Sequence, residues 1–276
     1  MKRSFRWLWM VGALLLIGTP AKGFDSADAL RAFRGKDYAG AYRGWKAAAD
    51  QGDPAAQFNL GMLYLKGLGV SMDPQEAFRL FRLAADRGQP DAQFQVGLMR
   101  EKGVGAQQDY ASAQHWYLMS AEKGDTDAEN ALASLYEQGY GVEKDLPRAV
   151  HWYKLAASQG MAEAQYHLGV LTEEGHGVKR DPAEALSLYT RSAGQGYAAA
   201  QTRLGQCYAT GKLTARNQEM ALFWLTLAVN QQNKDAIRLR PQVASKMSPD
   251  EVTRAESSAA SWSPKQDRPQ EGSTIR

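Results

Sequence analysis

The sequence predicts an all-α protein, an α-solenoid of stacked antiparallel helix pairs. Apolar residues recur three, four and seven positions apart, which is the spacing of amphipathic helices. Paired glycines divide the chain into segments of about one helix each, ~12 residues long. An alanine returns every 36 residues without insertion or deletion, and a two-helix repeat of that length buries its apolar face only by stacking on its neighbours. The recurring alanines are Ala56, Ala92, Ala128, Ala164, Ala200 and Ala236.

The first segment, residues 1–23, has the pattern of a secretory signal peptide. A basic start, MKRSFR, precedes a mostly apolar run from Trp7 to Gly18, and AKG then fits a small-x-small cleavage site. The run is shorter than the ~20 residues that a membrane-spanning helix needs. We therefore expect an exported protein, periplasmic or secreted, that begins at Phe24 and keeps no stable membrane span after signal cleavage. An uncleaved anchor is the alternative.

Residues 24–55 are predicted to form a truncated leading repeat that caps the N-terminal end of the array. Asp37, Ala41 and Trp45 match the second half of a repeat placed 36 residues earlier in the register. The chain before Asp37 is too short for a full first helix.

Each full repeat is expected to hold a first helix, a glycine loop and a second helix. In the first repeat, GLGVSMDPQEA starts at Gly67, and glycine suits the left-handed position after a helix end. Asp73 caps the second helix and Pro74 suits its first position. Small residues such as Gly61 and Ala77 let helix backbones approach closely. The five predicted repeats are 56–91, 92–127, 128–163, 164–199 and 200–235.

The C-terminal part is expected to close the array with capping helices over residues 236–262. Ser248 is a suitable N-cap for the last helix, and Pro249 fits its first position. Residues 263–276 are polar and are predicted to form a disordered tail. The expected buried face of the last helix consists of Val252, Ala255, Ala259 and Trp262.

The pattern A-x3-L-G-x2-Y-x2-G-x-G-V-x2-D-x3-A-x2-W-Y-x2-A-A-x2-G resembles the Sel1-like repeat (SLR) family, a relative of the tetratricopeptide repeats (TPR). The resemblance covers about Tyr38 to Ala236. It implies a TPR-like right-handed superhelix and a non-catalytic role in envelope assembly, signalling regulation or contact with a host. Ala106 replaces the usual valine, Ala133 replaces the glycine, and the fifth repeat is degenerate. These departures leave the fold prediction intact.

Composition argues against nucleic-acid binding. Four of the 33 Lys and Arg residues lie within the first 23 positions, where there is no acid, and the remainder is balanced by 30 Asp and Glu. The mature chain therefore lacks the excess of positive charge that a nucleic-acid-binding surface needs. Cys207 is the only cysteine, so no internal disulfide forms, and a small buried residue is its expected role. We expect a monomer.

The paired glycines are interpreted as helix punctuation and not as a phosphate-binding loop. Neither nucleotide-binding motif is complete, and no strand precedes the glycines. The fifth copy, GKLTARNQEMA, loses the second glycine and has Asn217 in place of aspartate. Ser120 to Lys123 formally match S-x-x-K, but Ser120 occupies a small-residue position of a helix and no companion motif is present.

The histidines and acids do not form a recognisable catalytic or metal-binding set. His115 and His151 are one repeat apart, whereas a metal site needs three or four converging ligands. His167 and His176 have no evident partner in the sequence. Adjacent acids at Glu173 and Glu174 are interpreted as a solvated face. The sequence thus predicts no catalytic residue, no metal and no cofactor.

A protein or peptide partner is expected on the concave surface formed by the first helix of each repeat. At 100° per residue, positions two, six, nine and ten after the leading alanine lie opposite the packed side. The predicted function is an exported scaffold for protein–protein interaction in the cell envelope. The predicted contact residues are Phe58, Met62, Phe94, Leu98, Glu101, Asn130, Glu137, Tyr166, Val170 and Glu173.

Two alternatives remain open at this point. The aromatic residues in this set are also explained if they pack against neighbouring helices as part of the core. A different function, that of an envelope hydrolase or of a β-lactam or cell-wall-fragment binding protein, is the other alternative. Cysteine-rich SLR relatives have been linked to β-lactam binding, but this chain lacks their paired cysteines.

Overall fold

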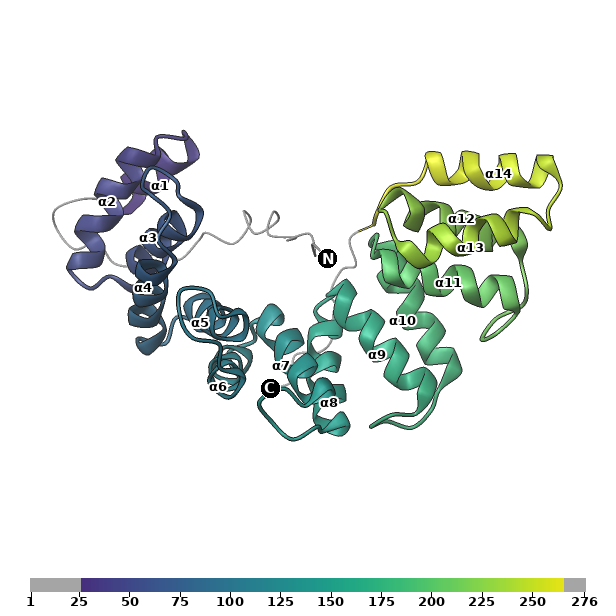
Figure 1. The fold of residues 1–276 in the computed structure, drawn as a ribbon, viewed down its shortest axis with the longest axis horizontal. Coiled ribbons are helices and arrows are strands. Elements are labelled where there is room, and N and C mark those ends of the chain that lie inside the picture. Colours follow the sequence, from purple (N-terminus) through teal and green to yellow (C-terminus); the bar gives the residue numbers. More distant parts are fainter. Residues whose placement is uncertain (1–25, 266–276) are drawn as a thin grey trace. The chain divides into compact units, whose positions relative to one another are not determined.

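The computed structural model describes residues 26–265, and all regular structure in that range is helical (Figure 1). The chain divides into two compact units between Asp109 and Tyr110. Unit 1 contains α1 (Ser26–Arg34), α2 (Tyr38–Asp50), α3 (Pro54–Lys66), α4 (Pro74–Asp86) and α5 (Pro90–Lys102). Unit 2 contains α6 (Tyr110–Ala121), α7 (Thr126–Gln138), α8 (Leu146–Ser158), α9 (Ala162–Glu174), α10 (Pro182–Gly194), α11 (Ala198–Thr210), α12 (Gln218–Asn230), α13 (Lys234–Ala244) and α14 (Pro249–Ala260).

Within each unit, helices pack in the order of the chain. Consecutive helices contact each other from α1 through α5 and, separately, from α6 through α13, while α14 packs on α12. Odd-numbered helices from α3 to α11 are the first helices of the five repeats, and we call these helix A. Even-numbered helices from α4 to α12 are the second helices, helix B, and we give the same name to α2, which holds this place in the leading segment. The predicted all-α solenoid of helix pairs is confirmed.

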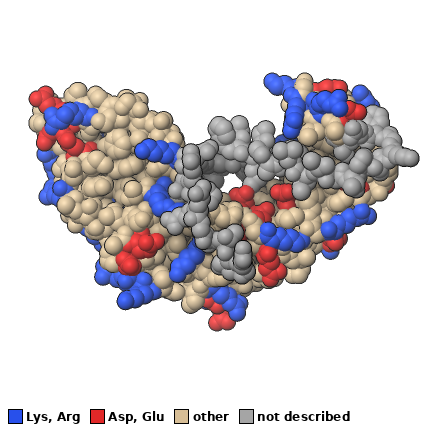
Figure 2. Space-filling view, turned by 180° about the vertical axis from the view of Figure 1, so that it is seen from behind, with Lys and Arg blue, Asp and Glu red and all other residues tan. Residues whose placement is uncertain are grey.

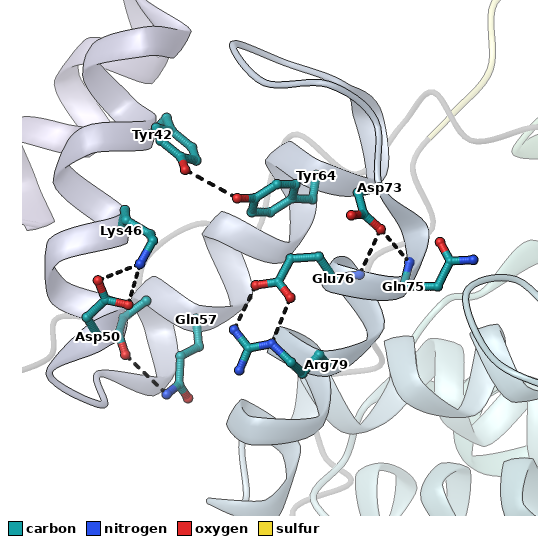
Figure 3. Close-up of polar contacts among 10 residues, drawn as sticks. Tyr42, Lys46, Asp50, Gln57, Tyr64, Asp73, Gln75, Glu76 and Arg79 are labelled. Carbon is teal, nitrogen blue, oxygen red and sulfur yellow. Dashed lines mark hydrogen bonds and ion pairs between the residues drawn. The ribbon is translucent and has the colours of Figure 1, made fainter.

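The helix boundaries follow the predicted local signals. The Asp73 side chain accepts hydrogen bonds from the backbone N–H groups of Gln75 and Glu76 at 3.1 and 3.0 Å (Figure 3). A cap of this kind contributes ~1 kcal/mol. Gly67 ends α3 in the left-handed conformation, with φ of 66°. Side chains also cap the helices that follow Asp53, Asp125, Asp145, Asp181 and Asn217.

In the loops that have two glycines, the second glycine is required for a reason other than ending a helix. Gly69 has φ of 70°, and a Cβ added there would lie 2.6 Å from the carbonyl carbon of Tyr38, at the start of the preceding helix B. Gly105 is placed in the same way against the carbonyl oxygen of Pro74. The loop therefore needs glycine both for its left-handed backbone and for its contact with the neighbouring repeat. This packing explains the recurring glycines without a bound phosphate.

Small residues let the helices approach closely inside each repeat. Ala77, on α4, has no exposed surface, and neither have the leading alanines of four of the five repeats. A Cβ at Gly61 would lie 2.8 Å from the ring of Phe81, and one at Gly205 would lie 2.6 Å from Leu225. Cys207 is buried as predicted, and burial raises the pKa of its thiol.

The ends of the array are helical. The leading segment has a nine-residue α1 before the 13-residue α2. Ser248 caps α14 in a reciprocal arrangement with Glu251. Ala255 and Ala259 are buried, while Val252 and Trp262 are partly exposed.

Residues 263–265, which were predicted to belong to a disordered tail, are placed in the structure. The Lys265 N–H donates a 2.9 Å hydrogen bond to the carbonyl of Gly194, so residues 263–265 follow the end of α10. Residues 266–276 and the predicted signal peptide at 1–23 lie outside the described part of the chain. Within the described range, no helix is long and apolar enough to cross a bilayer.

A pair of substitutions separates the two demands on a loop glycine. Gly105→Ala is expected to lower the free energy of unfolding by about 1–2 kcal/mol for its left-handed backbone and by roughly 1–3 kcal/mol more for overlap with Pro74. Gly124→Ala is the control, because Gly124 has φ of 83° but no atom lies within 4 Å of an added Cβ. It should show only the first loss. Denaturant unfolding measures both, and equal losses would contradict the packing explanation.

Candidate partner-binding face

The structure places the ten predicted contact residues on helix A of four repeats. We call the positions two, six, nine and ten residues after each leading alanine the helix A face. Nine of the ten predicted residues are partly exposed, and Glu173 is buried. By helix they are Phe58 and Met62 on α3, Phe94, Leu98 and Glu101 on α5, Asn130 and Glu137 on α7, and Tyr166, Val170 and Glu173 on α9.

Two of the three aromatic side chains on this face have ring contacts that show how they are held. The ring of Phe58 lies 5.5 Å from that of the buried Phe81, and the ring of Tyr166 lies 5.9 Å from that of the buried Tyr189. Tyr166 also contacts Tyr197 at 5.5 Å. Each ring thus rests on the core while part of it stays at the surface. Their use in binding stays a prediction.

Unit 2 has a recess on its helix A face, between α9, α11 and α13. Its volume is about 260 Å³, below the roughly 300–1,000 Å³ of most small-molecule sites. The recess therefore suits a side chain or a short stretch of a larger partner. Its lining consists of Tyr166, Val170, Glu174, Ala199, Thr202, Arg203, Gln206, Asn233 and Asp235.

A buried ionic cluster lies beside this recess. The Glu173 side chain is only 2% exposed, and its carboxylate accepts hydrogen bonds from the Tyr189 hydroxyl at 2.9 Å and from Nε of Arg203 at 3.1 Å. Nζ of Lys212 lies 2.7 Å from its other oxygen. Burial alone raises the pKa of Glu173, but the bonds from Arg203, Lys212 and Tyr189 together lower it to about 2. Arg203 lines the recess, and the buried carboxylate of Glu173 thereby neutralises its positive charge.

The interpretation of Glu173 and Glu174 as a solvated face is therefore wrong for Glu173. Glu174 is exposed and contacts Nδ1 of His176 at 3.0 Å. His167 is also not isolated, because it stacks on Tyr153 at 5.3 Å and lies 3.7 Å from Glu137. Neighbouring repeats bring Glu137 and His167 together, which their separation in sequence does not reveal, whereas Glu174 and His176 are only two residues apart.

Sequence reasoning missed Arg203 and Lys212, but one signal for the cluster was present. Glu137 and Glu173 are one repeat apart, and each accepts a hydrogen bond from a tyrosine 16 residues later, at 2.7 Å from Tyr153 and 2.9 Å from Tyr189. A glutamate and a tyrosine that repeat in register indicate contact between helix A and helix B. Nothing comparable marks Arg203, because it has no counterpart in the other repeats.

Unit 1 contains a second recess of about 260 Å³, between α2, α3 and α4. Lys46 pairs with Asp50 at 2.6 Å, and Arg79 pairs with Glu76 at 2.7 Å, on two sides of it (Figure 3). Gln57 donates to the carbonyl of Ala49 at 3.4 Å in the same region. The charged groups of this recess are paired with one another, so it offers no free group for acid–base chemistry.

The residues that the sequence offered for catalysis or metal binding are packed against other parts of the fold. Ser120 is fully buried in α6. His115 and His151 pack edge-on against the tryptophans that follow them, at 5.6 and 5.1 Å. Across residues 26–265, no three His, Cys, Asp or Glu side chains are grouped so as to hold a metal ion.

Five consecutive segments match the Sel1 repeat model, at residues 54–89, 90–125, 126–161, 162–197 and 198–233. The chain belongs to the Sel1 repeat family. These segments have the predicted period of 36 residues and start two residues before the predicted repeats, at the beginning of helix A. Among curated proteins, no sequence matches the chain.

Two solved Sel1-type structures are similar to the chain. A protective antigen of uropathogenic Escherichia coli strains that displays an SLR fold is 32% identical, with a TM-score of 0.74 over 85% of this chain. The alignment covers 52% of that protein, so this chain spans about half its length. A Sel1 repeat protein from Oxalobacter formigenes is also 32% identical, with a TM-score of 0.73, and the match covers 86% of this chain and 99% of that one.

The Glu173 cluster makes a testable contribution to stability. Glu173→Gln should lower the free energy of unfolding at pH 7 by about 2–3 kcal/mol, because it leaves the half-buried Arg203 without a counter-charge. The loss is smaller than for a fully enclosed pair, since Arg203 keeps some exposure. As the folded-state pKa is lowered, the difference from wild type should be complete above pH ~4.5 and vanish as the pH falls through about 2.

Glu137→Gln is the matched control for this measurement. Glu137 holds the same position one repeat earlier, and its carboxylate accepts from Tyr153 and lies 3.7 Å from His167 where Glu173 has an arginine. Denaturant unfolding should give a loss below about 1.5 kcal/mol for this variant. Similar losses for the two variants would show that Arg203 does not depend on Glu173.

Proposed function

We propose that this Sel1 repeat protein is an exported, non-catalytic scaffold that binds a protein or peptide partner through its helix A face. The observation that carries the proposal is the recess between α9, α11 and α13 on that face. Its lining combines the ring of Tyr166 with the amides of Gln206 and Asn233 and the carboxylates of Glu174 and Asp235. Aromatic and amide groups on a preformed surface suit the binding of an extended peptide.

The charges around the recess refine the expected partner. Glu173 neutralises Arg203 from below, so the outward-facing charges of the lining are those of Glu174 and of Asp235, which also pairs with Arg238 at 3.0 Å. Both of these carboxylates are exposed. A peptide with a lysine or arginine beside a polar main-chain stretch matches this arrangement.

Unit 1 supports the same role with different chemistry. Met62 and Phe58 on α3, and Leu98 on α5, give its helix A face a partly exposed apolar character. Exposed apolar positions grouped on one face are a common feature of protein-binding surfaces. We therefore assign apolar contacts to unit 1 and hydrogen-bonded contacts to unit 2.

Site-specific crosslinking tests the binding face. A photo-reactive residue at Val170 or Gln206, on the helix A face, is expected to crosslink to one and the same partner in cells that produce the full chain. The same group at Lys154 on α8 or Ser187 on α10, both exposed on helix B, is the control and should not. Crosslinking from the helix B positions alone, or equally from all four, would contradict the proposed face. Thermal unfolding of each variant checks that the fold is kept.

Export is tested by the N-terminus of the protein isolated from cells. Mass spectrometry of the native protein should show a chain that starts at Phe24, recovered from the periplasm or the medium. A chain that still starts at Met1 would contradict signal cleavage, and recovery from the cytoplasm would contradict export.

A further inference from the structure

One polar position is buried in every repeat, directly after the leading alanine. Gln57, Gln93, Gln165 and Gln201 occupy it in four of the five repeats and are at most 4% exposed. Each donates from Nε2 to the carbonyl oxygen eight residues earlier, at the end of the preceding helix B. The four distances are 3.4, 3.2, 3.3 and 3.2 Å, to Ala49, Ala85, Ala157 and Ala193.

The accepting carbonyl has the same second partner in these turns. The backbone N–H of the glycine three residues later, such as Gly88 above Ala85, also donates to it, at 2.8 to 3.1 Å. A carbonyl oxygen accepts two hydrogen bonds, so the glycine and the glutamine together satisfy it. This pair of bonds joins helix B to the next helix A.

The third repeat has a glutamate at this position, on an unchanged backbone. Gly124 donates to the carbonyl of Ala121 at 2.9 Å, as its counterparts do. Glu129 is 3% exposed, and its Oε2 accepts from Nε2 of Gln159 at 2.9 Å. In the next two repeats the same contact runs from Gln195 to Oε1 of Gln165 and from Gln231 to Oε1 of Gln201, also at 2.9 Å.

One carboxyl oxygen of Glu129 makes the contact that the amide oxygen makes in the next two repeats, so the other oxygen corresponds to the donating nitrogen. An ionised carboxylate would then present an acceptor to the Ala121 carbonyl, which is also an acceptor. In such a contact the second acceptor position of the Ala121 carbonyl, which already accepts from Gly124, and the facing oxygen of Glu129 would both lack a donor, at a cost that a single proton removes. We propose that Glu129 is held as a neutral carboxylic acid that donates its proton to the carbonyl oxygen of Ala121, in the role of the glutamine amide.

The surrounding groups favour the neutral form. Asp125, which caps α7, is the charged neighbour that acts on Glu129, and Asp127 lies in the same first turn. In the α6–α7 turn, Glu122 and Lys123 are both exposed, and Gln159 faces Glu129 from the end of α8 without a charge. Burial raises the pKa of Glu129, the bond from Gln159 opposes this, and Asp125 adds to it, to give a value of about 7.

Stability at this joint should depend on pH near neutrality. The folded chain keeps the Glu129 proton at pH values where the unfolded chain, with an ordinary pKa of 4.5, releases it. The stabilisation is complete below pH ~4.5 and is lost as the pH rises through about 7. The four glutamine joints have no such dependence, so mild alkali acts selectively on the contact of α7 with α6 and α8.

Two readouts test the assignment on the full chain. At pH 6, difference infrared spectra between wild type and Glu129→Gln should show the C=O stretch of one protonated carboxyl in wild type. Gln201→Glu, the reciprocal variant in the fifth repeat, should gain a second one, because among the described residues no cation is placed on the Ala193 carbonyl as Arg191 is on that of Ala157. NMR titration of the Glu129 carboxyl carbon in wild type should give a midpoint near 7 and needs no variant to fold.

Denaturant unfolding supplies the energetic test. From pH 5.5 to pH 8.5, the unfolding equilibrium constant of wild type should rise at least ~10-fold more than that of Glu129→Gln. Parallel pH profiles for the two proteins, a titration midpoint near 4.5, or no carboxyl band that the Glu129→Gln change removes would each overturn the proposal.

Discussion

Every feature of this protein depends on the requirement that one helix pair covers the apolar face of the next. A pair of 13-residue helices has no second layer, so its core is completed by its neighbours. Alanine or glycine at the contact positions brings the backbones together, as Gly61 does beneath the ring of Phe81. The same requirement places the second loop glycine against the preceding helix B. The repeat length is thus a consequence of packing geometry on both sides of each pair.

Close stacking buries backbone carbonyl groups that need hydrogen-bond donors, and one buried side chain in each repeat meets this need. The carbonyls at the end of helix B become buried against the next helix A, and buried carbonyls need donors. The glutamine after the leading alanine supplies one from a side chain that is itself almost fully buried. This donor joins helix B to the next helix A. Replacing the donor residue therefore alters that contact without altering the fold. Glu129 is such a change, and the backbone around it keeps the arrangement of the other repeats.

Much of the fold was predictable because its signals are local. Asp73, Pro74 and Gly67 act within four residues of their own position, so helix starts and ends can be identified from the sequence. The Glu173 cluster was not predicted, because Tyr189, Arg203 and Lys212 lie on other helices and loops, 16, 30 and 39 residues away. Only the repeated glutamate–tyrosine pair gave a hint of it.

Leu213 shows how strongly the stacked neighbours determine a loop. It replaces the second glycine in the fifth repeat, yet it has φ of 71°, as Gly141 and Gly177 do. A leucine does not favour this backbone, so tertiary packing imposes it, and the partly buried side chain lies against the core cluster of α10 to α12. The sequence alone indicated a degenerate loop there, whereas the conformation is conserved between repeats.

The difference between positions that are the same in all repeats and positions that vary also affects which partner the protein selects. The leading alanine, which all repeats share, has almost no exposed surface and cannot distinguish one partner from another. The position two residues after the leading alanine changes from Phe58 to Asn130 to Tyr166 and is partly exposed in each case. In the fifth repeat Thr202 is 5% exposed at that position, so the accessible row ends near the recess. A partner that binds the helix A face therefore contacts residues that can vary without disturbing the fold. Its specificity can change while the helices stay stacked.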